Sequence, residues 1–140
     1  MKIIITENEL QGTIKSMIKE LGIKSAIDFL GGQDTFSKVM GIDTPMEFLH
    51  LFDDLESFVS TEKPKYILFR HKKGDNIFTY NRNTNEVDVN RDGIWQFLEG
   101  VFGLTYSEVN TLILKWLSEV YNLNNVSISK YRRTMIYDLE

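Results

Sequence analysis

The segment from Asp88 to Glu99 carries oxygen-bearing side chains at the spacing of a calcium-binding loop. Such a loop supplies side-chain oxygens, one backbone carbonyl and a final bidentate carboxylate, which here would come from Asp88, Asn90, Asp92, Ile94 and Glu99. Gly93 permits the sharp turn that the loop needs. The residues before the loop, however, predict a strand rather than an entering helix, and no second loop is present for pairing. We therefore favour a strand that ends at Val89, followed by a helix with Asn90 or Asp92 as its N-cap.

A second pattern, between Lys24 and Met40, is typical of a helix-turn-helix. Two short segments with helical apolar spacing are joined by Gly31, Gly32 and Gln33. In a DNA complex the contacts would come from Thr35, Ser37 and Lys38 on the second helix and from Lys130, Arg132 and Arg133 in the tail. The chain as a whole is acidic, with 16 Lys and Arg against 20 Asp and Glu, whereas nucleic-acid modules concentrate positive charge. We therefore favour an ordinary helical hairpin and keep DNA binding as the alternative.

Aromatic residues are abundant, with nine Phe, six Tyr and two Trp. Trp95 and Trp116 have apolar neighbours at helical spacing, so we expect both in the core. An exposed cluster of Trp95, Tyr106 and Tyr121 would instead mark an interface with another protein, because Trp and Tyr dominate the energetics of such interfaces.

The sequence shows no catalytic set of residues. His50 lies among apolar residues and is expected to be a partly buried structural side chain, while His71 ends a basic segment and is expected to face solvent. Asp53 and Asp54 are adjacent, and adjacent residues of a helix do not share a face, so only Asp53 and Glu56 would converge. The absence of cysteine excludes disulfides, thiolate zinc sites and a cysteine nucleophile. We predict no enzymatic activity and, calcium apart, no cofactor.

Helices are expected over about residues 1–62. Three capping boxes mark helix starts, at Thr6 with Glu9, Thr44 with Glu47, and Thr105 with Glu108. Pro45 strengthens the second start, because proline suits the first helical position. A wide apolar face then predicts that this helix continues to about Val59.

Three β-rich runs separated by turn residues predict a three-stranded antiparallel meander over about residues 65–90. The runs are Lys65–His71, Asn76–Arg82 and Glu86–Val89. A helical pair is expected over about 92–123. Apolar and polar residues alternate weakly in the tail, 124–140, which is compatible with one further strand. The prediction is a single α+β domain over residues 1–140.

Charge is segregated along the chain. Residues 43–62 hold six acidic residues and no Lys or Arg, whereas residues 63–73 hold five Lys and Arg and no acid. We expect the acidic helix to neutralise the basic strand; the alternative is a basic edge kept for a partner. No segment approaches the roughly 18 apolar residues of a membrane span. The chain is therefore expected to begin at Met1 and to stay in a reducing cytoplasm.

The opening segment Met1–Leu10 resembles the start of small uncharacterised proteins of tailed phages and their bacterial hosts. The segment Ile94–Leu104, followed by Trp116 and Tyr121, is similar to such proteins as well. This resemblance implies a bacterial host cell or a virion as the setting, and action through binding of another protein. The prediction is a non-enzymatic interaction module with an unidentified protein partner, and edge pairing would make it a homodimer.

Overall fold

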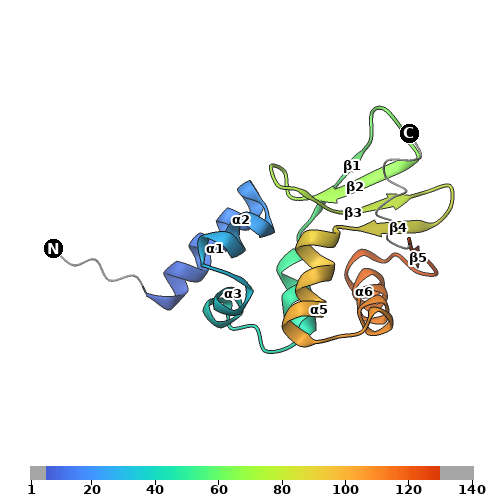
Figure 1. The fold of residues 1–140 in the computed structure, drawn as a ribbon. Coiled ribbons are helices and arrows are strands. Elements are labelled where there is room, and N and C mark those ends of the chain that lie inside the picture. Colours follow the sequence, from blue (N-terminus) through green and yellow to red (C-terminus); the bar gives the residue numbers. More distant parts are fainter. Residues whose placement is uncertain (1–5, 130–140) are drawn as a thin grey trace.

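The computed structural model describes residues 6–129, which form a group of helices beside a five-stranded sheet (Figure 1). The helices are α1 (Glu7–Leu21), α2 (Ile23–Phe29), α3 (Gln33–Met40), α4 (Pro45–Leu49), the 3-10 turn η1 (His50–Phe52), the π-helical turn η2 (Arg91–Trp95), α5 (Gln96–Phe102) and α6 (Tyr106–Tyr121). The strands are β1 (Glu56–Val59), β2 (Tyr66–Arg70), β3 (Asn76–Asn81), β4 (Glu86–Val89) and β5 (Ser127–Ile128). The predicted α+β class is confirmed.

All three predicted capping boxes are formed. In each, the threonine hydroxyl accepts a hydrogen bond from the backbone N–H three residues later, and the glutamate carboxylate accepts one from the threonine N–H. These bonds satisfy donors that a helix start would otherwise leave unpaired. The starts of α1, α4 and α6 are therefore local properties of the sequence.

The prediction of a three-stranded meander is wrong, because the sheet has five strands in the order β1-β2-β3-β4-β5. The middle strands β2, β3 and β4 fall on the three predicted runs and pair antiparallel. The strand β1 adds an antiparallel edge in which Glu56 lies opposite Arg70, and β5 pairs parallel with β4. The sheet is therefore mixed, and its outermost strands come from segments on either side of the meander.

The strand β1 occupies a segment that the sequence analysis assigns to a long helix. The helix instead ends after η1, where the side chain of Tyr121 meets its last turn. The Tyr121 hydroxyl donates to the carbonyl of Phe52 and accepts a hydrogen bond from the backbone N–H of Leu55 at 3.0 Å. These contacts satisfy backbone groups at the end of the helix. Apolar residues such as Phe58 fit a strand as well as a helix, so the tertiary contact decides between them.

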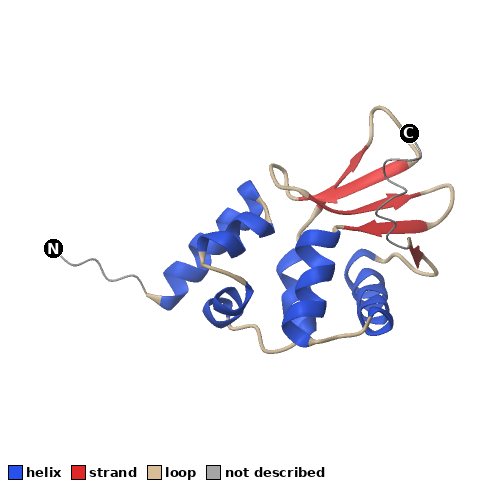
Figure 2. Cartoon of the chain, in the orientation of Figure 1, coloured by secondary structure: helices blue, strands red, loops and turns tan. Residues whose placement is uncertain are grey.

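The predicted C-terminal helical pair also differs from the structure. It begins with the π-helical turn η2, whereas the expected cap is confirmed: β4 ends at Val89, and the Asn90 side chain accepts a hydrogen bond from the backbone N–H of Gly93 at 2.8 Å. The helix α5 ends at Gly103, whose φ of 64° is readily adopted by glycine. The helix α6 then packs below the sheet (Figure 2).

The core joins the helices to the sheet through aromatic rings. Phe48 of α4 stacks on Phe97 of α5 with ring centroids 3.9 Å apart. On the sheet side, Phe78 of β3 meets the edge of Trp116 of α6 at 5.8 Å, and Tyr121 meets Phe78 at 5.3 Å. Such contacts contribute beyond the burial of apolar area. Within residues 6–129 no helix is both long enough and apolar enough to span a bilayer.

The contact between Gly93 and Ile23 tests how the N-terminal helices pack on the rest of the chain. A Cβ at position 93 would lie 2.4 Å from the Cγ2 of Ile23, which is 1% exposed. We expect Gly93→Ala to lower the free energy of unfolding by about 1–3 kcal/mol, because a buried side chain has no room to move aside. Urea unfolding followed by circular dichroism measures this loss.

The control is Gly12→Ala in α1, where a Cβ would meet nothing within 4 Å. There alanine should raise the free energy of unfolding by roughly 0.5–1 kcal/mol, as expected for an exposed helix position. Equal effects of the two substitutions would contradict the close packing of α2 against η2.

Candidate functional site

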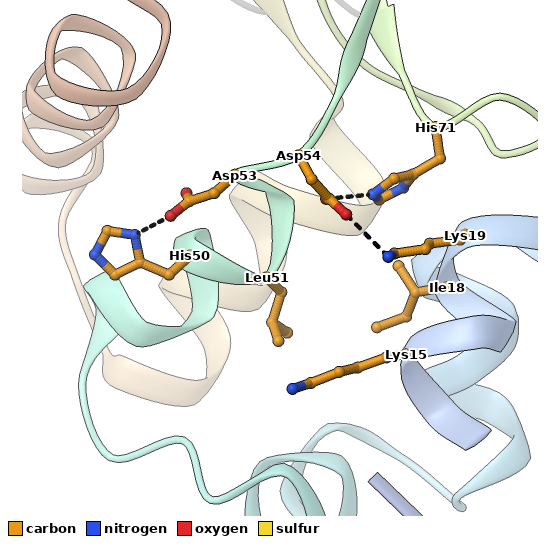
Figure 3. A pocket seen from close by; sticks show the side chains of 8 residues that line it. All are labelled: Lys15, Ile18, Lys19, His50, Leu51, Asp53, Asp54 and His71. Atoms are coloured by element: carbon orange, nitrogen blue, oxygen red, sulfur yellow. Dashed lines mark hydrogen bonds and ion pairs between the residues drawn. The ribbon is translucent and has the colours of Figure 1, made fainter. Parts of the chain in front are cut away.

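A hollow of about 320 Å³ lies between α1 and the segment that links α4 to β1 (Figure 3). Its lining combines charged side chains with an apolar floor and consists of Lys15, Ile18, Lys19, His50, Leu51, Asp53, Asp54 and His71. Three separate parts of the chain contribute: α1, the turn after α4, and the residue that follows β2. This hollow is the candidate site because it brings together most of the titratable groups that the structure pairs.

The Asp54 carboxylate contacts two side chains from different parts of the chain, Lys19 of α1 and His71 after β2. Its Oδ1 lies 2.9 Å from the Nε2 of His71, and its Oδ2 lies 2.9 Å from the Nζ of Lys19. Burial raises the pKa of the Asp54 carboxyl, but the hydrogen bonds and charges of His71 and Lys19 outweigh burial and hold the pKa below its ordinary value. Asp54 therefore stays ionised and links α1 to the sheet.

Asp53 is also fully engaged. Its Oδ1 accepts a hydrogen bond from the indole N–H of Trp116 at 2.9 Å, and its Oδ2 lies 2.8 Å from the Nδ1 of His50. Burial raises the pKa of the nearby Tyr121 hydroxyl, and the negative charges of Asp53 and Asp54 raise it further. The Tyr121 hydroxyl is therefore a permanent hydrogen-bonding group rather than an acid near neutral pH.

Lys15 differs from the other charged groups of the hollow. It lies one helical turn before Lys19, and Figure 3 shows its side chain reaching past Ile18 toward Leu51. Among residues 6–129 the structure shows no ion pair or hydrogen bond for its ammonium group. The hollow thus offers one cation that the protein leaves uncompensated.

Three residues that line this hollow lie in surroundings that differ from those predicted for them. His71 was expected to face solvent, but it is 5% exposed because its ring pairs with Asp54. His50 was expected to be partly buried, but its side chain is 47% exposed at the rim. The expected convergence of Asp53 with Glu56 is wrong as well, because the helix ends at Phe52 and the turn brings Asp53 and Asp54 to the same hollow. The residues after Asp54 do not alternate in polarity, so the sequence carries no local signal for this turn beyond the two adjacent acids.

The residues of the predicted calcium loop are only partly brought together. Asp88, Asn90 and Asp92 line a second hollow of about 360 Å³, and burial raises the pKa of the Asp88 carboxyl. The Asn90 side-chain oxygen is already used to cap η2, while Ile94 is buried in that turn and Glu99 lies on α5. No group of three or more His, Cys, Asp or Glu in the described chain is placed to hold a metal ion. Calcium binding stays a prediction.

The predicted helix-turn-helix segment forms α2 and α3 with a glycine turn between them. Thr35 and Lys38 of α3 are exposed, whereas Ser37 is partly buried and its hydroxyl has no hydrogen-bond partner among the described residues. Lys130, Arg132 and Arg133 lie outside the described residues. DNA binding therefore also stays a prediction, with no contact that favours it.

The three aromatic residues proposed as an exposed cluster do not form one. Trp95 is 2% exposed and packs against Tyr106 with ring centroids 4.8 Å apart, and Trp116 is fully buried, as expected for the core. The Tyr121 hydroxyl points inward to Phe52. Of the proposed cluster, only Tyr106 is exposed, at 39%.

Comparisons of the chain with models of known protein families, with curated proteins and with solved structures found no match. The chemistry of the hollow therefore rests on its own residues. None of the residues that line it carries a hydroxyl or thiol that would serve as a nucleophile. The carboxylates of Asp53 and Asp54 are paired with donors of the protein, whereas the ammonium of Lys15 is not.

The bridge through Asp54 predicts a pH-dependent contribution to stability. Asp54→Asn removes the negative charge that faces the buried His71. We expect this substitution to lower the free energy of unfolding by about 1–2 kcal/mol near neutral pH. Because the folded-state pKa of Asp54 is lowered, its contribution is present above the ordinary value and is lost as the pH falls through the folded value, below about pH 4. Urea unfolding of both proteins between pH 7 and pH 3 measures the difference.

The control for this measurement is Asp28→Asn, an exposed carboxylate of α2 for which the structure shows no ion pair. That substitution should change the free energy of unfolding by less than about 0.5 kcal/mol. If the difference in free energy of unfolding between the wild type and Asp54→Asn stays constant from pH 7 to pH 3, the bridge is contradicted.

Asp88→Ala tests the calcium loop, because it removes the ligand at the first loop position. If calcium binds, the wild-type protein should melt at a higher temperature in calcium than in chelator, and the variant should lose that rise. A rise of equal size in both proteins, or no rise in either, would reject the loop as a calcium site.

Proposed function

We propose that the protein is a non-enzymatic binding module that takes up an extended segment of another protein along β1. The observation that supports this most is the outer edge of β1, which the described residues leave unpaired. Val59 on this strand is 53% exposed, although it is a large apolar residue. An unpaired sheet edge is a template for an added strand, and this mode of recognition is common among peptide-binding domains.

The hydrogen-bond pattern identifies the groups that are available. Ser60 donates its backbone N–H to the carbonyl of Tyr66 at 3.0 Å, so Ser60 faces β2. Because the direction of N–H and C=O groups alternates along an antiparallel strand, Phe58 and Glu56 face β2 too. Ser57 and Val59 therefore direct their backbone groups away from the sheet.

Of the features by which proteins usually block such pairing, the edge has a short strand of four residues and one acidic side chain, Glu56, but not the others. The strand β1 contains no proline and no lysine, and its register with β2 runs without a bulge. The guanidinium group of Arg70 lies 4.2 Å from the ring centre of Phe58 and donates to the carbonyls of His71 and Lys72. The edge is thus short but accessible.

The partner we propose is a protein with an extended segment, in the bacterial or viral setting that the sequence resemblance implies. A second copy of the chain is the other occupant that the same edge would accept, so the test has to separate the two.

Val59→Pro tests the edge directly, because it removes an outward N–H while leaving the ladder between β1 and β2 intact. Tagged wild-type and variant chains are used to capture proteins from a nuclease-treated bacterial extract. We expect a stoichiometric partner with the wild type and at least a tenfold reduction with Val59→Pro. Circular dichroism should show that the variant remains folded.

Phe58→Pro is the matched comparison, because it removes an N–H that faces β2 and should destabilise the sheet itself. Equal capture by wild type and Val59→Pro would reject strand addition at β1. Sedimentation velocity separates the occupants: a wild-type dimer that becomes a monomer in Val59→Pro, without any captured protein, would assign the edge to a second copy and reject the proposed partner.

A further inference from the structure

The helix α1 places two lysines over the hollow of Figure 3. Lys15 and Lys19 lie four residues apart, so their side chains share one face of the helix and their positive charges repel each other. Asp54 compensates Lys19 at 2.9 Å. Lys15 has no ion pair within residues 6–129, so its ammonium group is the charged group of the hollow for which these residues provide no partner.

Each of the two carboxylates of the hollow is held by partners from the protein itself. Both oxygens of Asp53 are engaged, by Trp116 and His50, and both oxygens of Asp54 are engaged, by His71 and Lys19. An anion would meet the free ammonium of Lys15.

The floor of the hollow is apolar. Ile18 is 3% exposed and Leu51 is partly buried, and both lie beside the Lys15 side chain (Figure 3). A volume of about 320 Å³ is at the lower end of the range for small-molecule sites. The hollow therefore offers one unpaired ammonium group beside an apolar floor, and its volume is sufficient for a ligand with a few carbon atoms.

We propose that this hollow binds a small organic carboxylate, with its charge on Lys15 and its hydrocarbon part on Ile18 and Leu51. A single free ammonium matches one negative charge, whereas a dianion such as phosphate would bring a second charge close to Asp53 and Asp54. The site differs from the β1 edge in both residues and chemistry. It therefore stands or falls independently of strand addition.

The test uses the full chain and three probes that separate charge from apolar contact. The probe 4-methylpentanoate carries both features, acetate carries only the charge, and 4-methylpentan-1-ol carries only the hydrocarbon part. Titrations at pH 7 and constant ionic strength are followed by the backbone amide signals of Lys19 and Leu51 in two-dimensional NMR spectra. We expect saturable shifts at millimolar 4-methylpentanoate, and binding of acetate and of the alcohol at least about fivefold weaker.

Lys15→Gln should weaken binding of 4-methylpentanoate about fivefold, the size expected for one partly exposed ion pair. Lys24→Gln, which removes an exposed lysine of α2 away from the hollow, should leave binding unchanged. The site would be overturned by an absence of saturable shifts up to 50 mM, by equal binding of the alcohol or of acetate, or by unchanged binding in Lys15→Gln. The amide spectrum of each variant shows directly whether it remains folded.

Discussion

The carboxylate of Asp54 joins three parts of the molecule that are distant in sequence. It lies in the turn before β1, and it binds Lys19 at the end of α1 and His71 just after β2. His71 is 5% exposed, so its ring nitrogen depends on this single acceptor for its hydrogen bond. If Asp54 moved away, the buried ring nitrogen of His71 would be left without a hydrogen bond, which costs free energy. The bridge therefore restricts how α1 and the sheet lie relative to each other. Both the hollow and the start of β1 follow from it.

The position of Asp54 is itself set by α6. Tyr121 closes the end of the helix that begins at Thr44, through its contacts with Phe52 and Leu55, and Trp116 holds Asp53 beside it. The rings of Trp116 and Tyr121 pack in turn against Phe78 of the sheet. A helix near the end of the chain thus determines where an early helix stops. The acidic pair is placed by aromatic packing rather than by its own charges.

This dependence explains which features the sequence predicts. The capping boxes and the strands β2, β3 and β4 were predictable, because capping residues, turn residues and apolar alternation act within a few positions. The end of the helix before Asp53 could not be predicted from the sequence, because it requires Tyr121, which lies 69 residues after Phe52. His71 was misassigned for the same reason, since its partner Asp54 lies 17 residues earlier. The expected closeness of acidic and basic segments does appear, but as Glu56 opposite Arg70 in a strand pair rather than as a helix beside a strand.

The two proposed sites share this turn but use different chemical groups. The β1 edge offers backbone N–H and C=O groups at Ser57 and Val59, whereas the hollow offers the ammonium of Lys15. Only two positions separate Asp54 from Glu56, so a movement of the bridge would shift the start of β1 together with the wall of the hollow. The structure thus places Asp54 both in the wall of the hollow and in the turn that leads to the edge strand β1.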